Sequence, residues 1–76
     1  MIPGPKQRWM YKTPEGERWL AEILSAERTN VKVKILWTTP FAARSAGQLW
    51  DSAGLKDIFN GSMDTRWTYL EGQEAP

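Results

Sequence analysis

The stretch RWMYKTPEGERWLAEIL, residues 8–24, decides the fold of this chain. In its middle, TPEG places Pro14 second and Gly16 fourth, which suits a type I turn followed by a glycine in the left-handed conformation. Segments rich in aromatic and aliphatic side chains flank this turn on both sides. The stretch therefore predicts a β-hairpin, with one strand over residues 6–13 and a second over residues 17–24.

Side-chain alternation assigns two faces to this hairpin. Trp9 and Tyr11 share one face of the first strand, because successive side chains of a strand point to opposite faces. In the second strand, Trp19 and Ile23 share a face in the same way. These two residues also fit helical spacing, so a helix is the rival interpretation of the second segment. The turn signal that precedes the segment favours the strand.

Two further strands are predicted downstream of the hairpin. VKVKILW, residues 31–37, alternates β-branched residues with lysines, a pattern typical of a half-buried strand. The alternation places Trp37 on the same face as Val33 and Ile35. TRWTYL, residues 65–70, is predicted to be the closing strand, with its aromatic side chains on one face.

A short helix is predicted near residues 54–60, before the closing strand. Ser52 is a suitable N-cap, and the pair Asn60-Gly61 is a good helix stop. Residues 46–52 fit either a helical or an extended conformation, and the sequence leaves this choice open.

The summed pattern predicts a mainly β, small α+β fold of 4–5 antiparallel strands with one short helix. In size and in the order of its elements, the chain resembles the SH3-like small barrels, such as SH3, Tudor and chromo-type domains. A strongly bent antiparallel sheet and a four-stranded sheet with one packed helix are the alternatives. The resemblance implies no function, because these folds host many unrelated activities. The expected boundaries are an extended leader over residues 1–5, one domain over residues 6–70 and a polar tail over residues 71–76.

Composition argues against an enzyme. The chain of 76 residues contains neither cysteine nor histidine, which excludes disulfides, the common zinc sites and Ser–His or Cys–His catalysis. No glycine-rich phosphate loop is present, and no cofactor is expected. Asp51, Asp57 and Asp64 lie near aromatic residues, but capping and turn formation explain them better than catalysis.

Composition also suggests where the protein acts. No apolar run approaches the roughly 20 residues that span a bilayer, and the N-terminal segment lacks the apolar core of a signal peptide. A cytoplasmic location is therefore expected. The short length favours an accessory protein of a phage or of a mobile gene cassette.

The aromatic residues lead to the first hypothesis for function, a non-enzymatic module that binds a protein or peptide. Five Trp, two Tyr and two Phe exceed what one small core needs. Trp19, Trp37 and Trp67 are predicted to lie in the core. The remaining aromatic residues next to basic residues have the composition of an interface, and a homodimer is one expectation. The partner-binding candidates are Trp9, Tyr11 and Trp50.

Nucleic-acid binding by a small barrel is the alternative hypothesis. A sheet face with aromatic and positively charged side chains suits stacked bases, and the candidates are Lys12, Arg18, Lys32 and Lys34. A net charge of only +1 argues against this function, as do the glutamates of the same strands. Lysines that alternate along a strand also protect against edge-to-edge aggregation. Met10 and Leu36, on the faces opposite the predicted core, favour a protein interface instead.

Overall fold

The structure is a computed structural model that describes residues 2–39 and 46–72. It confirms a mainly β domain with one short helix. Residue 1 of the predicted leader and residues 73–76 of the predicted tail lie outside the described residues. In chain order the elements are β1 (Arg8–Lys12), β2 (Arg18–Ala26), β3 (Val31–Thr38), β4 (Leu49–Asp51), α1 (Ala53–Phe59) and β5 (Trp67–Glu71).

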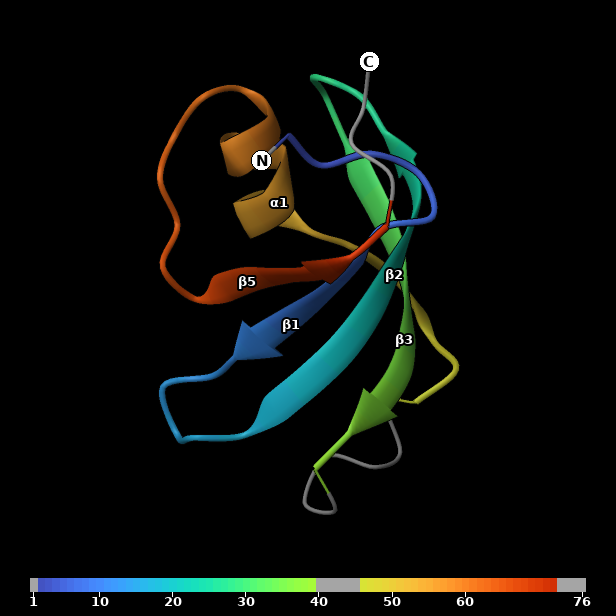
Figure 1. The fold of residues 1–76 in the computed structure, drawn as a ribbon, viewed down its shortest axis with the longest axis vertical. Helices are drawn as coiled ribbons and strands as arrows, with labels where there is room; N and C mark the ends of the chain where they lie inside the picture. Colours follow the sequence, from blue (N-terminus) through green and yellow to red (C-terminus); the bar gives the residue numbers. More distant parts are fainter. Residues whose placement is uncertain (1, 40–45, 73–76) are drawn as a thin grey trace.

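The five strands of the described residues belong to one antiparallel sheet, in the order β4-β3-β2-β1-β5. The sheet bends strongly, so that β1 and β5 cross the direction of β3 at a steep angle (Figure 1). The alternative of a four-stranded sheet is wrong, because part of the ambiguous segment 46–52 forms the edge strand β4. The narrower expectation of an SH3-like barrel stays a prediction.

The hairpin between β1 and β2 forms as the sequence predicts. Gly16 has a φ of 91°, and its N–H donates to the carbonyl oxygen of Thr13 over 3.0 Å. The N–H of Thr13 donates to the carbonyl oxygen of Glu17 over 2.9 Å, which closes the turn. A side chain at Gly16 would be strained by this φ, so the glycine fixes the turn type and with it the register of the hairpin.

A β-bulge in β3 changes the expected core. Ile35 pairs with Ala21 and Trp37 pairs with Leu20, so Leu36 is an extra residue on β3. The extra residue shifts the alternation by one position, and Trp37 therefore lies on the face opposite to Ile35. Its exposed fraction is 48%. The prediction that Trp37 belongs to the core is wrong for this reason.

Helix α1 begins and ends at the predicted signals. The Ser52 hydroxyl accepts a hydrogen bond from the N–H of Leu55 over 3.1 Å, which caps the N-terminus. Leu55 is fully buried, and the helix ends at Asn60, followed by Gly61 with a φ of 95°. The helix contacts β3 and so covers part of the inner face of the sheet. The buried apolar core consists of Trp9, Ala21, Ile23, Val31, Val33, Ile35, Leu55 and Trp67.

The segment before β1 is anchored by the buried side chain of Gln7. The Gln7 Oε1 atom accepts from the N–H of Gly4 and from the indole Nε1 of Trp9, each over 2.9 Å. Its Nε2 atom donates to the carbonyl oxygen of Ile2 over 3.0 Å. Pro3 and Gly4 are buried as a result, so this part of the predicted leader packs against the domain.

Candidate functional site

Four aromatic side chains form a cluster on the inner face of the sheet. Tyr11 lies with its ring centroid 4.8 Å from that of Trp67, 5.9 Å from that of Trp19 and 5.8 Å from that of Trp50. The Trp50 centroid lies 5.1 Å from that of Trp19 and 6.1 Å from that of Trp67. Because Trp50 belongs to edge strand β4 and Trp67 to edge strand β5, the cluster joins the two edges of the sheet through side chains.

The inner face accounts for most of the aromatic excess. Trp9 is only 4% exposed, donates its indole N–H to Gln7 and packs edge-on against Tyr69 at 5.7 Å. It is a core residue rather than a surface residue. Trp67 is 5% exposed, as predicted for the core. The other predicted core residue, Trp19, is partly buried and packs against the core together with the binding candidates Tyr11 and Trp50.

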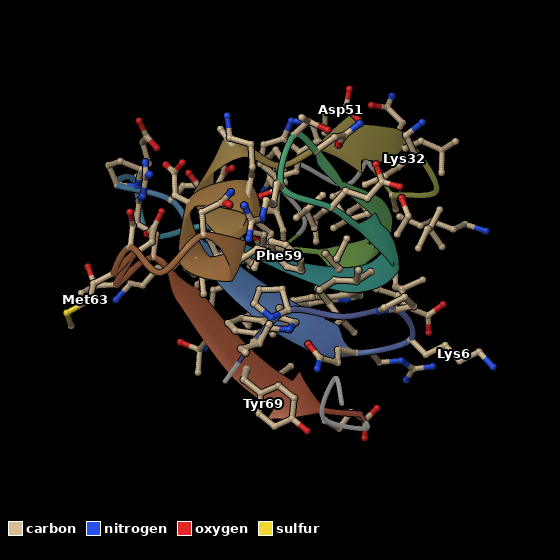
Figure 2. The ribbon with its side chains drawn as sticks, turned by 90° about the horizontal axis from the view of Figure 1, so that it is seen from above. Lys6, Lys32, Asp51, Phe59, Met63 and Tyr69 are labelled. Carbon is tan, nitrogen blue, oxygen red and sulfur yellow. The ribbon has the colours of Figure 1, made fainter. Side chains whose placement is uncertain are left out.

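A hollow lies between the C-terminal end of α1 and β5. It has a volume of about 380 Å³, and its walls include Ile58, Asp64, Trp67 and Tyr69. Met63 stands at its rim, 93% exposed, and projects away from the helix and the sheet (Figure 2). The hollow is mainly apolar, and the Asp64 carboxylate is its charged group.

A tight ion pair holds the Asp64 carboxylate. The Oδ1 atom of Asp64 accepts from the backbone N–H of Arg66 over 2.9 Å and from its Nε over 3.2 Å. The Oδ2 atom accepts from a terminal guanidinium nitrogen over 3.0 Å. These hydrogen bonds hold the pKa of Asp64 below its ordinary value, although partial burial acts in the opposite direction. The Arg66 guanidinium also lies 5.9 Å from the ring centroid of Tyr11, so the ion pair of Asp64 and Arg66 lies against the aromatic cluster.

The three acidic residues considered for catalysis lie on different elements. Asp51 ends β4, Asp57 lies in α1, and Asp64 lies in the loop before β5. Within residues 2–39 and 46–72, no group of three acidic, cysteine or histidine residues could hold a metal ion.

The outer face of the sheet carries a continuous apolar row. Met10 pairs with Leu20 across β1 and β2, and Leu20 pairs with Trp37 across β2 and β3. Met10 and Leu20 are partly buried, and Trp37 is 48% exposed. We call these three residues the outer apolar row. The sequence pointed to Met10 on this face, but it gave no signal for Trp37, because the bulge that turns this side chain outward is not visible in the alternation pattern.

The four nucleic-acid candidates separate into two pairs on this outer face. Lys12 and Arg18 lie directly opposite each other on β1 and β2. Lys32 lies opposite Asp51, and Figure 2 shows these two residues side by side at the β3–β4 edge. Lys34 lies opposite Glu22 of β2. The structure therefore matches two of the four cations with carboxylates and leaves the other two beside each other.

A row of alternating charge crosses the outer face and includes Lys34. Arg8 of β1 contacts Glu22 through its Nε at 3.4 Å and Glu71 of β5 through a terminal nitrogen at 3.2 Å. With Lys34 on the far side of Glu22, the charges along this row alternate in sign from β3 to β5. Such a row cancels most of its own potential, which disfavours the broad positive surface that nucleic acids require.

Comparison with known proteins found no matching family model, no similar curated protein and no similar solved structure. No helix in the described part of the chain is long and apolar enough to cross a membrane.

Proposed function

We propose that this protein is a non-enzymatic interaction module that binds a protein or peptide partner on the outer face of its sheet. The observation that carries the proposal is the outer apolar row, with Trp37 at 48% exposure. One face of an antiparallel sheet is commonly solvated and polar, so adjacent apolar side chains on three strands are unusual there. Tryptophan is also strongly enriched among the residues that dominate binding energy in protein interfaces.

The inner aromatic cluster supports this choice of surface. Most of the Tyr11 and Trp50 rings are packed against other aromatic rings, so their main effect is on folding. In the proposal they supply at most a secondary contact at their exposed edges. Trp37 has no such internal role, since its ring lies outside both aromatic groups of the inner face.

Nucleic-acid binding is the second candidate function. It is favoured only by Lys12 and Arg18 beside an exposed Trp37. The carboxylates that face Lys32 and Lys34 argue against it. A cytoplasmic location and an accessory role in a phage or a gene cassette belong to the same proposal, and they rest on length and composition alone.

Selection of peptides from a random display library, with the protein as the bait, tests the proposal. A selected peptide is synthesised, and its affinity is measured for the wild type and for Trp37→Thr. The matched control is Leu49→Thr, because Leu49 is 62% exposed on the same face but lies outside the outer apolar row. We expect Trp37→Thr to weaken binding at least tenfold and the control to weaken it less than threefold. Equal affinity for the wild type and Trp37→Thr would refute the proposed surface.

A further inference from the structure

The charges of the sheet show which chemistry a partner of the outer face would need. The five strands carry eight charged residues, of which five are cations and three are carboxylates. All three carboxylates lie beside cations other than Lys12 and Arg18, as the register and the ion pairs show. Among the strand residues, the excess positive charge therefore falls on Lys12 and Arg18, which we call the basic pair. Glu15 and Glu17 of the turn that joins the two strands form no ion pair with it.

The basic pair has no partner within the described chain. Lys12 and Arg18 are both exposed, and neither forms an ion pair among residues 2–39 and 46–72. Like charges directly opposite each other on adjacent strands disfavour folding. The pair therefore carries a small electrostatic cost, which an anionic group placed between the two side chains would remove.

The basic pair and the outer apolar row lie next to each other. Lys12 and Arg18 each lie two residues along the strand from Met10 and Leu20 respectively. Two residues of a strand span about 7 Å. This step matches the distance between residues i and i+2 of an extended peptide, and it is close to the i to i+4 distance of about 6 Å on a helix.

We infer that the partner is an acidic protein segment that carries a carboxylate near a large apolar side chain. The two residues lie two positions apart if the segment is extended, or four positions apart if it is helical. The apolar side chain packs on the outer apolar row beside Trp37, and the carboxylate binds between Lys12 and Arg18. This inference rests on the proposed function, since it names the partner chemistry of the same surface. Charge complementarity, together with the register of β1 and β2, selects this occupant.

Two other occupants fit the surface less well. Proteins that bind single-stranded nucleic acid combine a positively charged groove with several aromatic side chains on which successive bases stack. On the outer face of the strands only Trp37 offers a ring, while Met10 and Leu20 are aliphatic. A second copy of the chain can be related by a two-fold axis in the interface plane through the outer apolar row. An axis along the strands, between β1 and β2, places Lys12 on Arg18 of the other copy and so brings like charges together. An axis across the strands places Lys12 on Arg8 and Arg18 on Glu22, so one like pair and one opposite pair offset each other and the basic pair gains little.

Two synthetic peptides of equal length test the inference. Both carry Leu and Phe as apolar residues, and the residues two and four positions from each of them are Glu in one peptide and Gln in the other. Fluorescence anisotropy of the labelled peptides is measured at low and at high salt. We expect the wild type to bind the Glu peptide at least tenfold more tightly than the Gln peptide, and salt to reduce this preference, because screening weakens exposed charge contacts.

Matched variants then locate the preference. The double variant Lys12→Gln/Arg18→Gln should lose the tenfold preference. Its control, Lys32→Gln/Lys34→Gln, removes the same charge from the same face and should change the preference less than threefold. Trp37→Thr should weaken the binding of both peptides. Near-ultraviolet circular dichroism checks that each variant keeps the fold.

The outcomes separate the inference from the proposed function. If both peptides bind equally well and Trp37→Thr weakens both, the inference fails and the proposed function stands. If neither peptide binds, the inference fails, and the library selection decides the proposed function. Binding of an oligothymidylate that is lost in the Lys12/Arg18 double variant would replace the inference with nucleic-acid binding. Self-association that Trp37→Thr abolishes in sedimentation would replace it with a homodimer.

Discussion

Replacing Gln7 by Leu should be one of the most damaging single substitutions in this protein. The side chain of Gln7 is fully buried and makes hydrogen bonds with Gly4, Trp9 and Ile2. Leucine has a similar size and is apolar, so the change removes the hydrogen bonds without opening a large cavity. The loss of stability therefore reports the cost of leaving buried polar groups without hydrogen-bond partners, rather than the cost of lost packing.

The magnitude follows from the groups that the substitution leaves without partners. Two donors, the N–H of Gly4 and the indole N–H of Trp9, lose their acceptor in a buried place. Each such donor costs about 1–3 kcal/mol, and burial of the apolar leucine side chain offsets part of this cost. We expect a net loss of about 2–4 kcal/mol. A domain of 76 residues has a total stability of roughly 4–11 kcal/mol, so the loss is a large share of it.

Urea denaturation, followed by tryptophan fluorescence and by far-ultraviolet circular dichroism, measures this loss. Thr68→Val is the control, because Thr68 is exposed on β5, and it should change stability by less than about 0.5 kcal/mol. The double variant Gln7→Leu/Trp9→Phe lacks the indole donor and should lose less than the sum of the two single changes. A stability of Gln7→Leu within about 0.5 kcal/mol of the wild type would show that this buried network does not hold the N-terminal segment.

Three further predictions concern the helix, the ion pair and the outer face. Gly54→Ala gains up to about 1 kcal/mol of helix propensity, but its Cβ would lie 2.7 Å from Asp64 Oδ2 and from Trp67 Nε1. We expect a net loss of about 1 kcal/mol in thermal or urea unfolding, and a stabilised variant would contradict this packing. Because the pKa of Asp64 lies below its ordinary 3.8, its ion pair with Arg66 stabilises the fold above that pH and is lost as the pH falls through the lowered pKa. Asp64→Asn should therefore be less stable than the wild type at pH 7, and the difference should shrink below about pH 4; a constant difference would exclude this cause. Trp37→Thr should change stability by less than about 1 kcal/mol, because about half of the side chain is already in contact with water. A larger loss of stability in urea denaturation would show that Trp37 stabilises the fold.

The elements were predictable from the sequence because local signals define them. The turn around Gly16 needs a positive φ that glycine tolerates, and Ser52 supplies the cap that starts α1. Alternation correctly placed Trp9 and Tyr11 on one face of β1. It could not tell which face is buried, because this depends on how far the sheet curls and on the buried side chain of Gln7.

The candidate site was less predictable, because it depends on relations between strands. The bulge at Leu36 is defined by the pairing of β2 with β3. No residue type at or near Leu36 predicts a bulge from the sequence alone. The cross-strand positions of Lys12 and Arg18 depend on the same kind of register, which the hairpin turn does fix. The sequence thus contained the residues of the basic pair, whereas Trp37 was assigned to the wrong face.

The bulge at Leu36 makes the outer face tolerant of the loss of one residue in a way that substitutions do not capture. If Leu36 were deleted, regular alternation after Ile35 would still point Trp37 outward opposite Leu20, and Thr38 inward opposite Trp19. The outer apolar row would therefore survive the deletion, and only the local kink of β3 would be lost. Among descendants of this chain, those that lack one residue at this bulge would therefore still keep the surface.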